Sequence, residues 1–302
     1  MKSDHLKESR NIEDRRGQSY SQSSGNSNLG GGILQILLSP GSFKSKIIII
    51  LLMVLLGGGA SLGGLFGNGT SQPYQSTQVT RTNKTHVDDA DAQFVSKVLG
   101  TTEDHWHKVF QAEGRTYQEP KLVFYTGRTK TGCGVGQASA GPFYCPTDQK
   151  IYLDMSFYKE LTTKYKASGD FAMAYVIAHE VGHHVQNELG ILDKYHRMQQ
   201  GLSEKERNAI SVRIELQADY LAGVWARSIQ DRNLLDIGDI EEAMNAAHAV
   251  GDDTLQEQAY GYSVPDSFTH GTSEQRMRWF KRGYQYGDLQ HGDTFSLSDS
   301  EL

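Results

Sequence analysis

Hydrophobic residues are distributed unevenly along the chain, and its first residues hold few of them. Residues 1–33 are polar and charged, and Ser, Asn and Gly are frequent among them. A segment of this kind cannot bury enough apolar surface to offset the entropy lost on ordering. We therefore expect an N-terminal arm, residues 1–46, that is disordered.

A strongly apolar segment follows at residues 47–66, where no charged residue occurs. About 20 such residues match the length of a bilayer-spanning helix. Lys44 and Lys46 precede this segment, and residues 1–46 hold seven lysines and arginines against four acidic residues. The positive-inside rule then predicts a cytoplasmic N-terminus and a single-pass anchor, with all later residues outside the cytoplasm.

Two other interpretations of the apolar segment stay open. Its second half contains Gly, Ala and Ser, so it could be a signal peptide that is cleaved after the apolar core. It could also be a buried core helix, although positive charge on one flank alone argues against this. Residues 67–87 are polar and predict a linker.

From residue 88 onward, short apolar runs alternate with turns, which is typical of a folded domain. The first stretch suggests two short helices that are broken near Gly100. Residues 121–129 are strand-like, and we expect a hairpin with strands near 142–145 and 150–154. The first half of this domain is therefore predicted to supply a small mixed sheet.

Helical periodicity dominates the second half of the chain. We expect one helix from Asp170 to Gly190 and another from Ser203, a suitable N-cap, to Arg227. Two shorter helices are expected at the positions 238–250 and 273–283. The pattern as a whole predicts an α+β domain at residues 88–291, followed by a loose polar tail at 292–302.

Charge and cysteine content narrow the function classes. The formal net charge of -6 argues against general nucleic-acid binding. Only two cysteines, Cys133 and Cys145, are present, which is too few for a thiolate zinc site or a disulfide scaffold. They could form one disulfide outside the cytosol, or they could be two unrelated buried thiols.

The sequence His179-Glu180-Val181-Gly182-His183 carries the strongest chemical signal. Residues four apart share one face of a helix, so His179 and His183 can direct two imidazoles at one ion, and imidazole is a good zinc ligand. Glu180 can then take a proton from a water molecule that zinc activates. His184 is turned away from this face and is expected at the surface or behind the ligands.

A catalytic zinc needs a third protein ligand, and the next long helix offers one. Glu215 and Asp219 are four residues apart on one face of that helix. Glu215 can bind the metal, while Asp219 can accept a hydrogen bond from the far nitrogen of a ligating histidine. Apolar and small residues flank both carboxylates, which disfavours an ordinary exposed acidic face.

Several separate motifs now point to one family. The segments HEVGHHVQ, ELQAD, GPFYCPTDQKIYLD and THGTSEQRMRWFKRG together resemble the neutral zinc metallopeptidase family of bacterial membrane-anchored proteins. The resemblance implies a zincin-like α+β domain and a catalytic Zn²⁺ held by His179, His183 and Glu215, with Glu180 as general base. It also implies a family whose substrates are mostly undefined, and we expect a peptide or protein substrate. The positive-inside rule, and not the resemblance, predicts that the anchor lies in the inner (plasma) membrane with the catalytic domain periplasmic or otherwise extracytoplasmic.

The resemblance suggests further roles. His270 would donate a hydrogen bond to the oxyanion, and Arg276 would orient it or take part directly, although an ordinary helix-entry role is the alternative for His270. Tyr260 and Tyr262 are rival donors. The strand at residues 151–153 would bind an extended substrate along its edge.

Cys133 and Cys145 would form a disulfide just before that strand if the domain lies outside the cytosol. The expected function is that of a membrane-anchored, zinc-dependent endopeptidase. The alternative is a catalytically silent binding or scaffolding module at the cell envelope, and the presence of Glu180 disfavours it.

Overall fold

The structure, a computed structural model, describes residues 1–18 and 89–302, and these residues form one unit. Its strands are β1 (Ile12–Asp14), β2 (Lys121–Tyr125), β3 (Arg128–Thr131), β4 (Gly134–Gln137), β5 (Phe143–Cys145) and β6 (Lys150–Asp154). Its α-helices are α3 (Ala90–Ala112), α4 (Ser156–Thr163), α5 (Asp170–Glu188), α6 (Ile191–Met198), α7 (Glu204–Asp231), α8 (Asp239–Ala249), α9 (Asp252–Tyr260) and α10 (Ser273–Tyr286).

A four-stranded sheet has the order β1-β2-β6-β5, in which only β5 runs antiparallel to its neighbour. Side chains alternate between its two faces. Leu122 and Ile151 belong to the main core with α3 and α5, whereas Val123 and Tyr152 pack on the other side with Phe143. The predicted hairpin of β5 and β6 is confirmed. The proposed substrate edge at 151–153 is wrong, because β6 has paired neighbours on both sides.

The first 18 residues are ordered in the structure, which contradicts the prediction of disorder for this part of the arm. Residues 12–14 form β1, which pairs in parallel with β2. Glu13 forms ion pairs with Arg15 at 2.7 Å and with Lys150 of β6 at 2.8 Å. Composition predicts disorder for an isolated segment, but an edge strand obtains its backbone partners from a sheet that already exists.

The pairing of β1 with β2 also bears on the predicted topology. A single membrane crossing at residues 47–66 would leave the first residues on one side and β2 on the other. Paired strands must lie on the same side, since their N–H and C=O groups bond directly. The predicted cytoplasmic N-terminus with an outer catalytic domain is therefore incompatible with this pairing.

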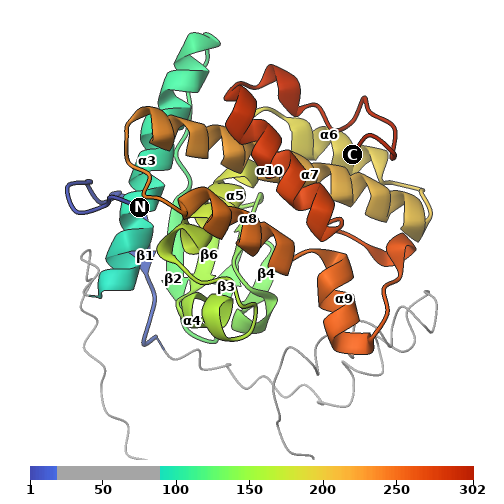
Figure 1. The fold of residues 1–302 in the computed structure, drawn as a ribbon, viewed down its shortest axis with the longest axis horizontal. Coiled ribbons are helices and arrows are strands. Elements are labelled where there is room, and N and C mark those ends of the chain that lie inside the picture. The colour runs from blue at the N-terminus through green and yellow to red at the C-terminus, as the bar shows by residue number, and fades with distance from the viewer. Residues whose placement is uncertain (19–88) are drawn as a thin grey trace, which may run out of the picture. The chain divides into compact units, whose positions relative to one another are not determined.

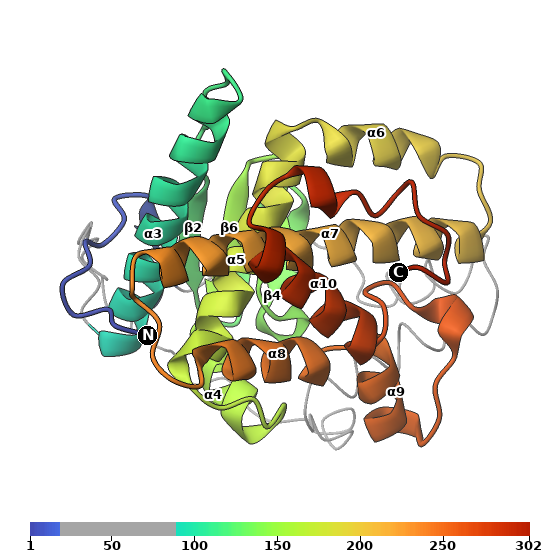
Figure 2. The ribbon, with the colours of Figure 1, turned by 45° about the horizontal axis from the view of Figure 1, so that its top comes forward.

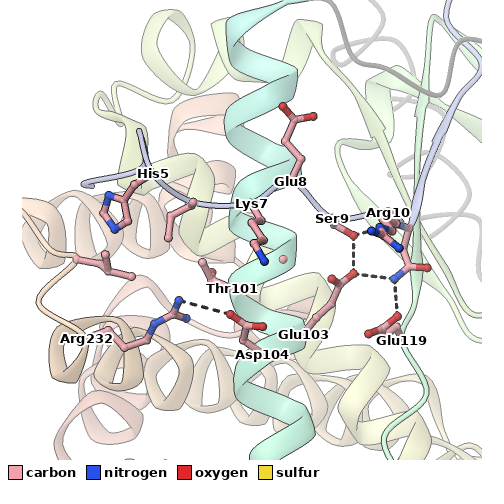
Figure 3. A pocket seen from close by; sticks show the side chains of 14 residues that line it. His5, Lys7, Glu8, Ser9, Arg10, Thr101, Glu103, Asp104, Glu119 and Arg232 are labelled. Carbon is pink, nitrogen blue, oxygen red and sulfur yellow. Dashed lines mark hydrogen bonds and ion pairs between the residues drawn. The ribbon is translucent and has the colours of Figure 1, made fainter.

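The residues before β1 lie along α3, with a cavity of about 570 Å³ beside them (Figure 3). Ser9 Oγ donates to Glu103 at 2.6 Å, and Asn11 Nδ2 donates to Glu103 at 2.9 Å and to Glu119 at 2.6 Å. A Cβ atom at Gly100 would lie 3.0 Å from the carbonyl oxygen of Lys7. Gly100 therefore allows this approach within one continuous helix, and the predicted break there is wrong.

Four helices in the second half of the chain build the rest of the core. Figures 1 and 2 show α10 lying against α7, with α5 crossing beneath α7 and α8 beside α5. A Cβ atom at Gly223 of α7 would lie 2.0 Å from the carbonyl oxygen of Phe280 in α10, so a side chain there would separate the two helices. The predicted helices at 170–190, 203–227, 238–250 and 273–283 are confirmed.

The C-terminal residues are not loose, and the prediction of a free tail is wrong. Leu302 is buried with an exposed fraction of 4%, and its carbonyl oxygen accepts a hydrogen bond from the Trp279 indole at 3.1 Å. Arg213 of α7 donates to the carbonyl oxygen of Leu297 at 2.8 Å. The tail is polar in composition, but these backbone acceptors and one terminal leucine attach it to α7 and α10.

None of the helices within residues 1–18 and 89–302 has the length and apolar character needed to cross a membrane. The predicted anchor at 47–66 and the predicted linker at 67–87 lie outside the described residues.

Candidate metal centre

The helices α5 and α7 cross one another (Figure 2), and together they carry the three predicted ligands. His179 and His183 project from α5, and Glu215 projects from α7. One donor atom from each of these residues lies within 4.8 Å of the other two. The Nε2 atom of His179 is 3.1 Å from Glu215 Oε2, and the Nε2 atom of His183 is 3.5 Å from Glu215 Oε1.

These separations suit a tetrahedral zinc ion. Two ligand atoms that each lie about 2.0–2.1 Å from a tetrahedral zinc are about 3.3 Å apart, which lies between the two observed distances. Two imidazoles and one carboxylate are also a donor set that zinc prefers, and three protein ligands leave a fourth position for water or substrate. The residues present therefore fit the ion.

Gly182, between the two histidines, permits the close approach of α7. A Cβ atom at this position would lie 2.9 Å from the carbonyl oxygen of Ala218 and 3.2 Å from its Cα atom. Ala218 follows Glu215 by less than one turn of α7. The absence of a side chain at Gly182 therefore fixes the distance between the imidazoles and the third ligand.

Buried polar groups orient His179. Its Nδ1 atom is 2.8 Å from Asp219 Oδ1, and Asp219 is fully buried. Asp219 also accepts hydrogen bonds from Tyr175 at 2.5 Å and from the Arg276 guanidinium at 2.8 and 3.0 Å. Because Nδ1–H donates to Asp219, the lone pair of Nε2 is directed toward the metal position.

His183 is oriented by a residue that the sequence analysis did not single out. Its Nδ1 atom is 2.9 Å from Gln186 Oε1, and the amide of Gln186 donates to the carbonyl oxygen of Ile214 at 2.8 Å and to Gln217 at 3.0 Å. Gln186 lies three residues after His183, as Tyr175 lies four before His179. This helical spacing is the signal that could have identified both orienting residues.

The electrostatics of the cluster favour a cation. Burial opposes a positive charge on His179, but the carboxylates of Asp219 and Glu215 outweigh it and raise the pKa of His179 to about 10. Burial likewise opposes the charged form of Glu215, yet nearby His183 and His270 hold the pKa of Glu215 well below its usual range. A metal ion would neutralise the negative potential of these carboxylates and displace the proton that His179 would otherwise bind.

Glu180 lies on α5 next to His179 and is buried, with an exposed fraction of 7%. Within the described residues, its carboxylate has no hydrogen bond or ion pair to another side chain. A carboxylate next to a metal position with no protein partner can bind water and accept a proton. This is the arrangement that a general base requires.

His270 lies in the connection between α9 and α10, near enough to Glu215 for their charges to interact, with 49% of its side chain exposed. Its Nδ1 atom is 3.0 Å from Thr269 Oγ1 and 3.4 Å from Asp252 Oδ1. The negative charges of Glu215 and Asp252 favour the protonated imidazole and raise the pKa of His270.

Arg276 has a different partner from the one predicted. Its buried guanidinium binds Asp219 and the hydroxyl of Tyr175, which agrees with the predicted place behind the ligands, and within the described residues it forms no hydrogen bond with His270. The rival donors Tyr260 and Tyr262 lie near one another, with ring centroids 6.3 Å apart, and Tyr262 is 63% exposed.

His184 was expected at the surface or behind the ligands, and because it is fully buried the surface alternative is wrong. Its Nδ1 atom is 3.0 Å from the Tyr144 hydroxyl, and its Nε2 atom is 2.6 Å from the carbonyl oxygen of Gln118. Tyr144 belongs to β5, the edge strand of the sheet nearest α5. His184 therefore connects the helix that carries the ligands to this edge.

A disulfide joins Cys133, in the turn between β3 and β4, to Cys145 at the end of β5. It closes a loop with a sequence separation of 12 residues. The β3–β4 hairpin is thereby attached covalently to the strand that His184 holds against α5.

A second group of acidic residues lies at the start of α5, where Asp170, Asp239 and Glu242 approach one another. The α-amino group of Met1 is 3.0 Å from Asp170 and 3.3 Å from Asp239. Glu242 accepts a hydrogen bond from the first turn of α5 at the Phe171 amide. These carboxylates already have cationic and backbone partners, and no histidine accompanies them.

Comparisons with known proteins agree with this geometry. The model of a family described as "Putative neutral zinc metallopeptidase" matches residues 1–295. The uncharacterized protein YpfJ of Escherichia coli K12 is 50% identical over 292 residues, which cover 97% of this chain and 98% of that protein. The uncharacterized protein Mb2605 of Mycobacterium bovis is 43% identical over 194 residues, or 61% of this chain and 64% of that protein. No solved structure matches the chain significantly.

Proposed function

Since this chain belongs to the neutral zinc metallopeptidase family, we propose that it is a zinc-dependent endopeptidase whose metal is held by His179, His183 and Glu215. The observation that carries the proposal is that one donor atom from each of these three residues converges next to Glu180. Within the described residues, the Glu180 carboxylate has no side-chain partner. A structural zinc site would be closed by four protein ligands, whereas three ligands are typical of a catalytic one.

The chain's own residues would share the work of hydrolysis. When bound, zinc would act as a Lewis acid toward the scissile carbonyl and lower the pKa of the attacking water. The Glu180 carboxylate would accept the proton of that water and deliver it to the departing amine nitrogen. Asp219 and Gln186 would keep the two imidazoles in the tautomer that leaves Nε2 free to bind the metal.

Charge that develops on the carbonyl oxygen requires a hydrogen-bond donor. His270 lies beside Glu215, and its Nδ1 atom is already engaged by Thr269 and Asp252. Its Nε2 atom is therefore the nitrogen that would donate to the substrate oxygen. The edge of β5, which α5 adjoins, would bind the extended peptide through backbone hydrogen bonds.

We further propose that the peptidase acts outside the cytoplasm, held at the inner membrane by residues 47–66. The Cys133–Cys145 disulfide supports an oxidising compartment. The uncharged, apolar character of residues 47–66 supports association with a bilayer, without the single crossing that the β1–β2 pairing excludes. Since β1 pairs with β2, the proposal requires residues 1–18 to lie on the same side as the metal centre.

The decisive experiment replaces the proposed base. Glu180→Gln should lower peptide cleavage by at least about 10²-fold, because general-base catalysis contributes that much, while zinc stays bound in equimolar amount. Cleavage is measured by mass spectrometry on a library of unstructured peptides, and zinc is measured by elemental analysis.

Glu188→Gln is the matched control, since it makes the same change two turns further along α5. It should retain both activity and zinc. Removal of zinc with a chelator should abolish wild-type cleavage, and added zinc should restore it. If wild type and Glu180→Gln bind zinc but are equally inert on every peptide, a silent binding module is the better assignment.

A further inference from the structure

One buried carboxylate organises the loop that carries His270. Asp252 is the first residue of α9, and its exposed fraction is 9%. Its Oδ2 atom accepts three backbone N–H groups, from Thr269 at 2.7 Å, His270 at 2.6 Å and Gly271 at 3.1 Å. The Asp252 amide in turn donates to the carbonyl oxygen of Gly271 at 2.9 Å.

The residues between the short η3 turn (Pro265–Ser267) and α10 form no regular secondary structure, so their backbone groups depend on side-chain partners. Gly271 has a φ angle of +91°, a left-handed conformation that glycine adopts without strain. The four hydrogen bonds between Asp252 and residues 269–271 therefore stabilise one conformation of this loop, which the loop would not keep without them.

Asp252 also acts on the imidazole itself. Its second oxygen, Oδ1, lies 3.4 Å from His270 Nδ1, and Thr269 Oγ1 lies 3.0 Å from the same nitrogen. Both contacts involve Nδ1, so they fix the rotation of the ring and leave Nε2 as the outward nitrogen. Within the described residues, no protein group hydrogen-bonds to that Nε2 atom.

The geometry points to Asp252 as the positioning residue for His270, one that holds the imidazole so that Nε2 can reach the carbonyl oxygen of a peptide bound at the metal centre. The inference rests on the proposed peptidase function. Asp252 itself would touch neither the metal nor the substrate. Its effect is transmitted through the backbone of residues 269–271 and through the Nδ1 contact.

A double-mutant cycle tests this assignment. His270→Ala should lower kcat by about 10²–10³-fold, as the loss of one oxyanion donor does. Asp252→Asn should lower kcat by about 10²-fold, because misplacing a catalytic group by about 1 Å has that effect, with KM and zinc content unchanged. In the His270→Ala background, Asp252→Asn should have little further effect, since its target is then absent.

Asp253→Asn is the matched control. Asp253 is the neighbouring carboxylate, and it bonds Thr254 and Ser273 but not the 269–271 loop. It should leave kcat unchanged. The assignment would be overturned if the two losses of kcat multiply in the double variant. It would also be overturned if Asp253→Asn lowers kcat as much as Asp252→Asn does. If Asp252→Asn does not fold, Asp252→Glu retains the charge and should give a smaller loss of kcat in the same cycle.

A second readout does not depend on activity. In zinc-depleted protein labelled with ¹⁵N-histidine, Asp252→Asn should shift or broaden the His270 imidazole signals while those of His179 and His183 stay unchanged. Unchanged His270 signals would overturn the positioning role. A wild type that is inert on all peptides, but whose His270 signals respond to Asp252→Asn, would reject the peptidase proposal and retain the structural part of the inference.

Discussion

At the scale of single residues, the metal centre depends on partners that lie behind the ligands. Each histidine has its Nδ1 atom engaged, His179 by Asp219 and His183 by Gln186, and each presents Nε2 to Glu215. The two orienting groups differ in charge. Asp219 is an ion-paired carboxylate, whereas Gln186 is a neutral amide held by α7.

Replacement of Gln186 should weaken zinc binding without preventing folding. In Gln186→Ala, the ring of His183 loses the acceptor that fixes its tautomer, and zinc affinity should fall by about 10-fold. Competition with a fluorescent chelator measures the change. Gln200→Ala removes an exposed glutamine as the control. An unchanged affinity in Gln186→Ala would show that the hydrogen bond does not contribute.

Gly182→Ala should affect the centre by a different route. The added methyl group would meet the carbonyl oxygen of Ala218 at 2.9 Å, so α7 must move away by a few tenths of an ångström. Such overpacking costs about 1–3 kcal/mol in the free energy of unfolding. Denaturant unfolding and zinc titration should both detect the change, and a variant with full stability and full zinc affinity would contradict it.

At the scale of secondary-structure elements, prediction from sequence succeeds where the pattern is local. The periodicity of α5, the Ser203 cap of α7 and the Pro146 turn between β5 and β6 are contained in adjacent residues. These features are enough to place His179, His183 and Glu215 on two helices. They do not show that α5 and α7 touch at Gly182, which depends on the packing of distant segments.

Prediction fails where an element depends on a distant partner. β1 is stabilised by β2, and the apparent break at Gly100 is a site where residues 7–9 approach α3. Asp252 was missed for a related reason, whereas Gln186 was missed although its spacing from His183 was a local signal. Asp252 acts through bonds to residues 269–271, and nothing in its residue type distinguishes it from other polar residues.

The attachment of β1 should be sensitive to acid. Burial opposes the charged form of Glu13, but Arg15 and Lys150 outweigh it and lower its pKa from 4.5 to about 2. A carboxylate with a lowered pKa stabilises the folded state above pH 4.5, and that contribution is lost as the pH falls from about 4.5 to 2. The protection factor of the Leu122 amide, which donates to Asn11, is the intrinsic exchange rate relative to the observed rate at the same pH, and it should therefore fall over this interval.

Glu13→Gln should show faster exchange at neutral pH and a weaker acid response. The effect is expected to be about 1 kcal/mol or less, because Glu13 is 38% exposed and solvent screens its ion pairs. Glu8→Gln, in the segment before β1, serves as the comparison. Equal acid responses in wild type and Glu13→Gln would rule out this carboxylate as the cause.

The Cys133–Cys145 disulfide should stabilise the sheet region and not the metal centre. Closing a loop of this length contributes about 3 kcal/mol, mainly by restricting the unfolded chain. The Cys133→Ser, Cys145→Ala variant should therefore unfold at lower denaturant concentration while its zinc content stays equimolar. Loss of zinc on reduction would instead indicate that the hairpin supports α5 directly.

At the scale of the whole molecule, residues 1–18 and 89–302 form one unit, so we expect them to lie in one compartment. Single cysteines introduced at the exposed positions Asp4 and Ser300 should react equally with a membrane-impermeant maleimide in intact cells. Reaction of both supports a peptidase outside the cytoplasm, and reaction of neither places it inside. Opposite labelling of the two positions would mean that β1 does not pair with β2 in the membrane-bound protein.

The β1–β2 pairing also sets an order of events during synthesis. Ile12 leaves the ribosome long before its partner Leu122, and at about 10 residues per second the wait is on the order of ten seconds. Throughout this interval β1 has no strand to pair with. Any partner that binds the residues between β1 and β2 during synthesis therefore binds them before the sheet is complete. Closure of the N-terminal edge is thus a late step, and a chain that fails to complete it would expose an unprotected β2 edge to aggregation.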